Sequence, residues 1–329
     1  MVVKKPKIVI GDSIFLEEKH IKRLNKLGET IIYEDTPESE EEIIERAKGA
    51  NIAIFGWSDL TKNILEKLPE LWLISYWATG YDYVDVRTAA EKGIAVCNVP
   101  GYASEAVAEH VFGLILAYIR KIPQAFSYVK SGKFNWKEFR GTELMGKTLG
   151  IIGTGSIGSR VAEIAKCFKM NVIAYTAHPN AEKEKRFGVK FVDMDTLLTE
   201  SDIISLHLPL KKETEKMFGR EEFKKMKKSA ILVNTSRGKI IDEDALTNAL
   251  KSNEIAGACL DVLAVEKPRL NSELIEMNNV LITPHIAFHT KESLIRCTDI
   301  CIDNIESFLN GSSINVVNPE YIKNARFKK

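Results

Sequence analysis

Short apolar runs alternate with helical patterns along most of the chain, and this order restricts its possible folds more than any other feature. Helical spacing is clear at Leu16–Leu27, which Gly28 ends, and at Thr61–Leu68. Thr36-Pro37-Glu38 predicts a further helix start, because proline suits the first helical position. The expected strands are Lys7–Ile10, Thr30–Tyr33, Asn51–Phe55, Leu71–Ser75 and Ile94–Val99. This α/β order is typical of a parallel sheet with helices on both faces.

The alternation restarts after a long helix and a connecting segment. We expect a mostly apolar helix at Tyr102–Ile119, then a polar and aromatic segment without strands at Lys130–Gly146. The second set of expected strands is Thr148–Ile152, Asn171–Tyr175, Asp202–Leu208, Ala230–Thr235, Ala256–Val262 and Val280–Thr283. The expected helices are Ser156–Phe168, Asp242–Lys251 and about Lys291–Leu309. At ~150 residues per domain, the 329 residues have room for two such units.

Composition and charge exclude several classes of protein. With 45% hydrophobic and 28% charged residues, the chain is close to an average globular protein and unlike a disordered one. A net charge of +1 gives no general attraction to nucleic acid, and no apolar run approaches the ~20 residues that cross a bilayer. We therefore expect neither a nucleic-acid partner nor a membrane partner.

The cysteines are scattered and odd in number. They are Cys97, Cys167, Cys259, Cys297 and Cys301, without a CxxC pair. That pattern predicts neither a disulfide framework nor a metal site. Because the N-terminus also has too short an apolar stretch for a signal peptide, we expect a cytoplasmic protein.

The strongest chemical motif is a glycine loop, Gly153-Thr154-Gly155-Ser156-Ile157-Gly158, between an apolar strand and a helix. In this context Gly153 permits a tight turn, and Gly155 lets the backbone approach a pyrophosphate. Gly158 lets the helix pack on the strand, and the helix N-terminus stabilises the phosphate charge. The loop therefore predicts a dinucleotide-binding unit; a glycine-rich turn without a ligand is the alternative.

The acid that usually binds the adenosine ribose is missing. The next strand ends in Ala174-Tyr175-Thr176-Ala177-His178-Pro179, without Asp or Glu. An acid at this place binds the ribose hydroxyls of NAD and repels the extra phosphate of NADP. Thr176 and His178 are candidates for contact with that phosphate. The sequence therefore predicts NAD and also permits NADP.

Three polar side chains follow strands of the second unit. Arg237 follows the expected strand at 230–235, Glu266 lies beyond 256–262, and His285 follows 280–283. Sheets of this class bind ligands at the carboxyl ends of their strands. A lone histidine after a strand is more often structural. Three such residues beside a dinucleotide loop favour a shared site.

In these motifs the chain resembles the D-isomer-specific 2-hydroxyacid dehydrogenases over nearly its whole length. The motifs are Ala78–Asp85, Ala106–His110, Gly153–Gly158, Leu206–Leu210, Val233–Gly238, Asp261 through Glu266, and Thr283–Ala287. The resemblance implies two Rossmann-like, doubly wound parallel-sheet domains. These are a flavodoxin-like substrate domain, residues 1–99 and 291–329, and an NAD(P)-binding Rossmann domain, residues 100–290. It also implies a homodimer involving the helix at Tyr102–Ile119.

The family resemblance implies reversible reduction of a 2-oxo acid to the D-2-hydroxy acid by hydride transfer. His285 would be the acid/base, because an imidazole ordinarily titrates near neutral pH, and Glu266 would stabilise its cation. Arg237 would hold the carboxylate and carbonyl oxygens of the acid through its paired donors. The carboxylate of Glu266 distinguishes the chain from the related formate dehydrogenases, which carry an amide there.

Further contacts follow from the same resemblance. The implied cofactor contacts are Gly153, Gly155, Ser156, Ile157, Gly158, Thr176, His207, Pro209, Thr235, Arg237, Asp261 and His285. The implied substrate contacts are Thr79, Gly80, Arg237, His285 and Phe288. Phe288 favours a small or apolar 2-oxo acid, although ordinary packing explains this residue equally well.

The substrate and two other functions stay open at this point. Pyruvate, glyoxylate, hydroxypyruvate and longer 2-oxo acids all fit the resemblance. A 3-phosphoglycerate dehydrogenase would need a cationic phosphate pocket, which the sequence does not locate. Some relatives act as corepressors, so a nucleotide-sensing interaction protein is a further alternative. The intact Arg237, Glu266 and His285 set argues against a purely binding role.

Overall fold

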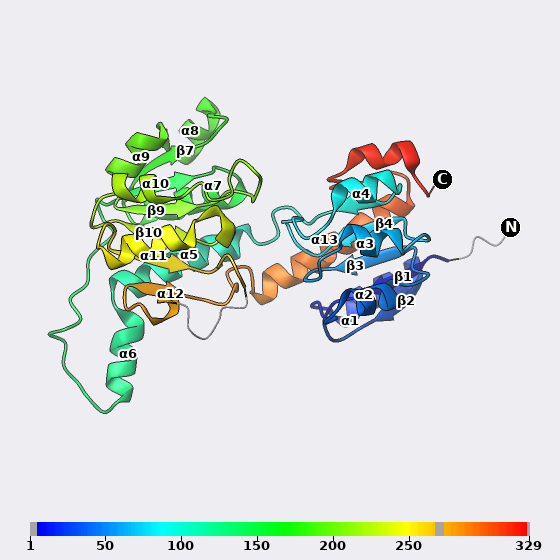
Figure 1. The fold of residues 1–329 in the computed structure, drawn as a ribbon, viewed down its shortest axis with the longest axis horizontal. Helices are drawn as coiled ribbons and strands as arrows, with labels where there is room; N and C mark the ends of the chain where they lie inside the picture. Colours follow the sequence, from blue (N-terminus) through cyan, green and yellow to red (C-terminus); the bar gives the residue numbers. More distant parts are fainter. Residues whose placement is uncertain (1–4, 267–272, 328–329) are drawn as a thin grey trace. The chain divides into compact units, whose positions relative to one another are not determined.

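The computed structural model describes residues 5–266 and 273–327 and divides the chain into two compact units (Figure 1). Unit 1 comprises Met1–Tyr102 and Thr290–Lys329, and unit 2 comprises Ala103–His289. Each unit has its own parallel sheet. The predicted α/β class with two parallel sheets is confirmed.

Unit 1 contains a five-stranded sheet in the order β2-β1-β3-β4-β5. Its strands are β1 (Lys7–Ile10), β2 (Glu29–Ile32), β3 (Ile52–Phe55), β4 (Leu73–Tyr76) and β5 (Ala95–Cys97). All adjacent pairs are parallel, with Ile8 opposite Ile52 and Ile54 opposite Ser75. Both central strands β3 and β4 are buried along their whole length, as expected for a sheet covered on both faces.

Helices from both ends of the chain cover this sheet. They are α1 (Glu18–Leu27), α2 (Glu40–Ala47), α3 (Lys62–Glu66), α4 (Val86–Glu91), α13 (Lys291–Leu309) and the 3₁₀ helix η2 (Pro319–Asn324). The predicted start of α2 at Thr36-Pro37-Glu38 is wrong. Ser39 is the N-cap instead, because its hydroxyl accepts a hydrogen bond from the Glu42 amide at 3.2 Å. Helix α13 packs on β4, where the Ser75 hydroxyl donates to the Cys301 carbonyl at 3.1 Å.

Unit 2 contains a seven-stranded parallel sheet in the order β12-β11-β10-β9-β6-β7-β8. Its strands are β6 (Thr148–Ile152), β7 (Asn171–Tyr175), β8 (Lys190–Phe191), β9 (Ile203–Leu206), β10 (Ile231–Asn234), β11 (Gly257–Leu260) and β12 (Val280–Ile282). The order reverses at β6, the strand before the glycine loop. Such a reversal is where open α/β sheets bind ligands.

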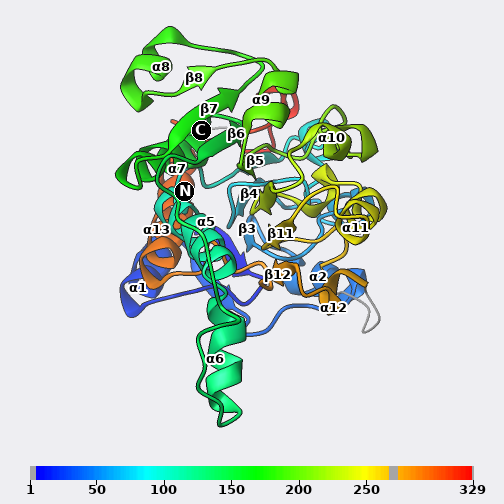
Figure 2. The ribbon, with the colours of Figure 1, turned by 90° about the vertical axis from the view of Figure 1, so that its left-hand side faces the viewer.

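Two helices of unit 2 precede its first strand, and the others lie between its strands in the sequence. They are α5 (Ser104–Ile119), α6 (Ile122–Lys130), α7 (Ser156–Cys167), α8 (Ala181–Phe187), α9 (Met194–Glu200), α10 (Arg220–Lys225), α11 (Glu243–Lys251), α12 (Glu273–Glu276) and the 3₁₀ helix η1 (Gly238–Ile240). Both views show α6 extending away from the sheet (Figures 1 and 2).

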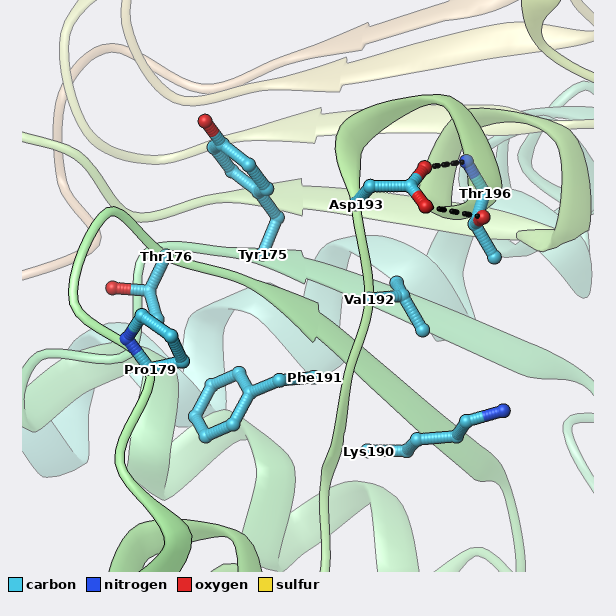
Figure 3. A pocket seen from close by; sticks show the side chains of 8 residues that line it. All are labelled: Tyr175, Thr176, Pro179, Lys190, Phe191, Val192, Asp193 and Thr196. Atoms are coloured by element: carbon cyan, nitrogen blue, oxygen red, sulfur yellow. Dashed lines mark hydrogen bonds between the residues drawn. The ribbon is translucent and has the colours of Figure 1, made fainter.

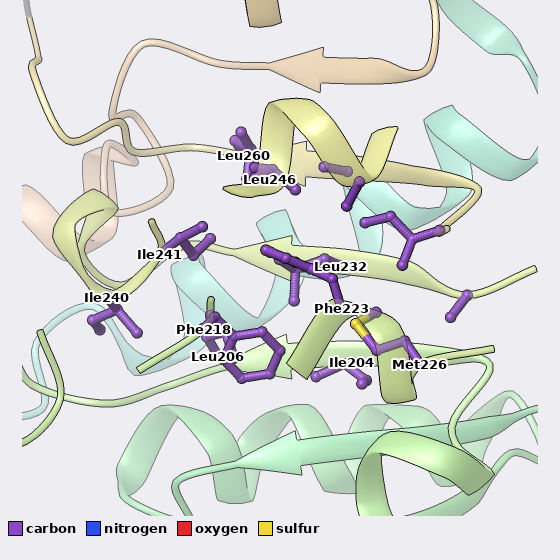
Figure 4. Close-up of a cluster of buried hydrophobic side chains, with 14 of the residues drawn as sticks. Ile204, Leu206, Phe218, Phe223, Met226, Leu232, Ile240, Ile241, Leu246 and Leu260 are labelled. Atoms are coloured by element: carbon purple, nitrogen blue, oxygen red, sulfur yellow. The ribbon is translucent and has the colours of Figure 1, made fainter. Parts of the chain in front are cut away.

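The core of unit 2 lies on both faces of its sheet. One cluster contains Ile204, Leu206 and Leu232 (Figure 4), and the other contains the alternate strand residues Ile203 and Val233. Alternate residues of a strand point to opposite faces, so the two clusters cover opposite sides. Helix α5 places its apolar residues in the second cluster, which explains its apolar sequence.

Three further properties concern membrane-spanning helices, metal sites and the cysteines. Within residues 5–266 and 273–327, no helix is long and apolar enough to span a bilayer. The same residues contain no cluster of three His, Cys, Asp or Glu side chains suited to a metal ion. All five cysteines are free, and only Cys167 is exposed.

Candidate active site

The glycine loop begins where β6 ends and has room only for glycine at two positions. Gly153 has a φ of +95°, and a Cβ there would lie 2.4 Å from the His207 carbonyl oxygen. A Cβ on Gly158 would lie 2.0 Å from the Gly153 carbonyl oxygen. The loop is therefore a tight turn packed against both a neighbouring loop and its own helix.

The same loop leaves open space where a phosphate would approach. Apart from Gly155 and its two chain neighbours, no atom of the described residues lies within 4 Å of a Cβ placed on Gly155, the N-cap of α7. No described side chain caps this twelve-residue helix, so its first amides and dipole are directed at that space. On the neighbouring β10 end, the buried Thr235 Oγ1 has no hydrogen-bond partner in the described residues. These features fit a bound dinucleotide.

A cavity of about 490 Å³ lies beyond β7, the strand that would carry the ribose-binding acid (Figure 3). Its lining includes Thr176, Lys190 and Asp193. Asp193 caps α9, since its two carboxylate oxygens accept from the Thr196 amide at 2.7 Å and the Thr196 hydroxyl at 3.0 Å. The one carboxylate that lines this cavity is therefore already committed to a helix cap.

Arg237 follows β10 in a loop that its own polar side chains fix. The Asn234 side-chain amide donates to the Arg237 carbonyl at 2.9 Å, and its oxygen accepts from the Ser236 amide at 3.0 Å and hydroxyl at 2.8 Å. Strand β10 pairs with β11, and β11 pairs with β12, in parallel register. Their carboxyl ends therefore meet at one edge, where the residues after them include Arg237, Glu266 and His285.

His285 and Glu266 form a close pair at this edge. The distance from His285 Nδ1 to Glu266 Oε2 is 3.3 Å, and the two side chains are 28% and 39% exposed. Phe288 packs edge-on against the imidazole, with ring centroids 6.0 Å apart. The imidazole is thus oriented by a carboxylate on one side while keeping access to solvent. This arrangement suits a group that exchanges protons with a ligand.

Asp261 is buried, and its predicted contact with the cofactor stays a prediction. Its carboxylate accepts from the Thr283 hydroxyl at 2.5 Å and from the Ile286 and Ala287 amides at 2.9 and 2.8 Å. Burial favours a higher pKa for Asp261, but hydrogen bonds from His110, Thr283 and the two amides outweigh it and hold the pKa below the usual range. Asp261 therefore remains a carboxylate that anchors the loop carrying His285.

His207 and Pro209 follow β9 beside the glycine loop. His207 Nε2 lies 2.9 Å from the Ser205 hydroxyl. Burial lowers the pKa of His207 to about 4, so the ring is neutral at physiological pH. A neutral ring can offer a hydrogen bond at this place but no positive charge for phosphates.

The predicted substrate residues Thr79 and Gly80 lie in unit 1, after β4. The Thr79 hydroxyl donates to the Val99 carbonyl at 2.6 Å, and the Asn98 side chain donates to the Thr79 carbonyl at 2.7 Å. These bonds hold the loop that carries both residues. Their contact with a substrate remains a prediction.

Trp57 follows β3 in the same unit and was not among the predicted site residues. Its side chain is 43% exposed at the carboxyl edge of the sheet, where its indole N–H donates to the Ser13 carbonyl at 3.0 Å. The ring meets Trp77 edge-on at 5.9 Å.

Comparisons with known proteins agree with this geometry. Residues 112–287 match the family profile described as D-isomer specific 2-hydroxyacid dehydrogenase, NAD binding domain. The chain is 39% identical over 328 residues to a glyoxylate reductase of Thermococcus litoralis, covering 97% of this chain and 98% of the relative.

Two solved structures give the same result for the fold. An acyclic imino acid reductase in complex with NADPH and D-Arg has a TM-score of 0.88 and 38% identity, covering 94% of this chain and 99% of that chain. A D-lactate dehydrogenase from Aquifex aeolicus, complexed with NAD and lactic acid, has a TM-score of 0.83 and 33% identity, covering 95% and 99%.

Proposed function

Because the chain belongs to the D-isomer-specific 2-hydroxyacid dehydrogenase family, we propose that it reduces a small 2-oxo acid, with His285 as the proton donor. The chain is an NAD(P)-dependent oxidoreductase that acts on CH–OH groups. The observation that carries the assignment of His285 is its 3.3 Å pairing with Glu266 at the strand edge that also carries Arg237.

The proposed chemistry divides among these three residues. A nicotinamide cofactor held by the loop at Gly153–Gly158 would supply the hydride for the carbonyl carbon. Glu266 orients His285 through Nδ1, which leaves Nε2 to deliver a proton to the carbonyl oxygen. The Arg237 guanidinium pairs with the substrate carboxylate and stabilises the charge that develops on the carbonyl oxygen. In the reverse direction His285 accepts the proton.

The two units divide the ligands in this proposal. Unit 2 binds the cofactor through Gly153–Gly158, with Thr176, His207, Pro209 and Thr235 as further contacts. Asp261 also remains a proposed cofactor contact, and its fully buried carboxylate supports the loop of His285. The amides near Thr79 and Gly80 in unit 1, and Phe288 in unit 2, remain proposed substrate contacts.

A substrate panel tests the function. Purified protein is assayed by absorbance of NADH and NADPH with glyoxylate, hydroxypyruvate, pyruvate and a longer apolar 2-oxo acid; 3-phosphoglycerate is tested in the oxidative direction with NAD and NADP. We expect turnover with at least one small 2-oxo acid. Turnover with 3-phosphoglycerate alone would show that the substrate is this phosphorylated hydroxy acid and not a small 2-oxo acid. No turnover with the whole panel would contradict the proposal.

Cofactor preference follows from the loop after β7. The absence of an acid there, together with the Asp193 side chain committed to its helix cap, removes the usual barrier to NADP. We propose that both cofactors bind. Titration of protein fluorescence should give dissociation constants for NADH and NADPH within about 10-fold, which is about 1.4 kcal/mol. A preference for NADH larger than about 100-fold would contradict this.

Reduction of an imino acid is a second candidate. The solved structure with a TM-score of 0.88 is an imino acid reductase bound to NADPH, and the β7 loop of this chain likewise permits NADPH. The same assay with a 2-oxo acid and added primary amine distinguishes the two activities. A rate that depends on the amine, with an N-substituted amino acid as product, would favour the second candidate.

We propose a homodimer formed through α6 and the segment after it. No residue of α6 is buried, and Ile122, Phe126 and Val129 are 53%, 63% and 50% exposed. Phe134 and Trp136 follow with 93% and 79% exposure. An extended apolar arm of this kind needs a partner, and a second copy supplies a complementary one. Light scattering should give a dimer that F126D with W136D converts to monomers; a monomeric wild type would contradict the proposal.

We propose that the protein is cytoplasmic. All five cysteines are free, including Cys297 and Cys301 one turn apart in α13. A reducing compartment keeps such thiols unpaired. Thiol alkylation during lysis of the source cells, followed by mass spectrometry, should find all five modified after denaturation; a disulfide would contradict this location.

A further inference from the structure

Asp261 holds the loop of His285 through successive backbone groups. Its carbonyl oxygen accepts from the His285 amide at 2.8 Å, and its carboxylate accepts from the next two amides, Ile286 and Ala287, at 2.9 and 2.8 Å. Three consecutive N–H groups therefore end on one buried residue. Asp261 therefore fixes the direction in which the loop presents the imidazole of His285.

The backbone of His285 needs such support. Its φ is 54°, in the left-handed region that is unfavourable for a residue with a Cβ. A left-handed residue persists when surrounding bonds determine its conformation. Loss of those bonds would let the backbone relax and turn the imidazole away from its position beside Glu266.

His110 reaches this support from helix α5. Its Nε2 lies 3.0 Å from the Thr283 hydroxyl oxygen and 3.5 Å from Asp261 Oδ1. A threonine hydroxyl has one hydrogen, and Thr283 donates it to Asp261 at 2.5 Å. The Thr283 oxygen must therefore accept from His110, so the Nε2 atom of His110 carries a hydrogen.

We propose that His110 is a positioning residue for His285. Its N–H fixes the Thr283 hydroxyl, and Thr283 and Asp261 together hold the amides on which the orientation of His285 depends. The inference rests on the proposed function, because it takes His285 as the group that transfers the proton. It adds a residue on α5, distant in the sequence, to the requirements for turnover.

Two substitutions of His110 separate positioning from packing. His110→Leu keeps a comparable volume but removes the donor, whereas His110→Gln places an amide N–H near the position of Nε2. We expect the leucine variant to lose about 10- to 100-fold in kcat, since small misplacements of a reacting group have this effect. The glutamine variant should recover most of that loss. The dissociation constant for NADH should stay unchanged in both, as measured by protein fluorescence.

A double-mutant cycle with Thr283→Val completes the test. Both substitutions break the same bond, so H110L/T283V should lose no more kcat than the larger single loss. Losses that multiply, equal losses in the leucine and glutamine variants, or a wild-type kcat in H110L would overturn the proposal. If H110L fails to fold, T283V against T283S provides the same comparison of a lost and a kept hydroxyl.

His285→Ala distinguishes failure of the positioning proposal from failure of the proposed function. Loss of turnover in H285A with a wild-type kcat in H110L overturns only the role of His110. Full turnover in H285A overturns the proton-donor role of His285 itself, and with it the basis for a positioning residue.

Discussion

In both sheets a buried aspartate holds a neighbouring loop, but the two loops carry different side chains. In unit 1, Asp12 follows β1, and its Oδ2 accepts from three successive amides, residues 56–58, at 2.7, 2.7 and 3.0 Å. In unit 2, Asp261 follows β11 and accepts from the amides of residues 286–287. Each buried carboxylate fixes the loop after a neighbouring strand, and the hydrogen bonds compensate the cost of its burial.

The difference lies in what each loop carries. The hydrogen bonds of the Asp12 carboxylate end on the loop that it holds, because the Ser58 hydroxyl donates to its other oxygen at 2.5 Å. This loop presents the exposed ring of Trp57. The Asp261 loop presents His285, and its hydrogen bonds continue to His110 on α5. The buried aspartate determines how firmly each loop is held. The residue that the loop carries determines the function of the loop.

The largest expected effect comes from the residue that the unit 2 loop presents. His285→Ala should lower kcat by about 100- to 10,000-fold, the usual contribution of general acid–base catalysis. Cofactor binding should persist, because the glycine loop is intact. His289→Ala, a nearby exposed histidine, is the matched control and should keep its kcat. Steady-state kinetics and NADH titration measure both; equal losses in the two variants would remove the special role of His285.

The two aspartates give the next effect and the sharpest comparison. An asparagine amide would face an N–H group, so D12N and D261N should each lower the free energy of unfolding by about 1–3 kcal/mol. Only D261N should also lower kcat, by about 10- to 100-fold, because only its loop carries the proton donor. Urea unfolding and kinetics provide the measurements. If D12N lowers kcat as much as D261N, the two loops do not differ in function.

Acid pH should reduce the stabilisation that Asp261 provides. Its folded-state pKa lies below its unfolded value, despite burial, because four hydrogen bonds favour the charged form. Its contribution is therefore fully present above about pH 4 and is lost as the pH falls through the lower folded value. The difference in unfolding free energy between wild type and D261N should shrink from pH 6 to pH 3. A difference that grows on acidification would contradict this.

The smallest effect is expected for the loop of unit 1. Trp57→Ala should lower kcat/KM for a small 2-oxo acid by no more than about 10-fold, or about 1.4 kcal/mol, because the proposed proton transfer does not use Trp57. A loss as large as that of H285A would show that Trp57 takes part in the chemistry and would remove the contrast between the loops.

The sequence predicted most of the sheets because their strands are short apolar runs with clear limits. Strands β1, β6 and β7 and helix α13 lie at the predicted residues. Helix α6 and strand β8 were not predicted. Helix α6 follows α5 after only two residues, and its apolar side chains Ile122, Phe126 and Val129 are exposed instead of packing in a core. Short elements such as β8, with two residues, give too little pattern to detect.

The prediction of the candidate site was limited in a similar way. Glu266 and His285 were predicted together because both follow strands, and the structure places them 3.3 Å apart. The support of His285 was not predicted, because His110 and Thr283 are 173 residues apart and meet only when α5 packs on the sheet. Trp57 was missed because no motif surrounds it.

The configuration of the product tests the central claim most directly. The reaction with pyruvate or hydroxypyruvate, whichever is reduced faster, is run to completion with NADH or NADPH and analysed by chiral chromatography. We predict the D-2-hydroxy acid in molar equivalence to the cofactor oxidised. The L-2-hydroxy acid, or cofactor oxidation without any hydroxy acid, would contradict it.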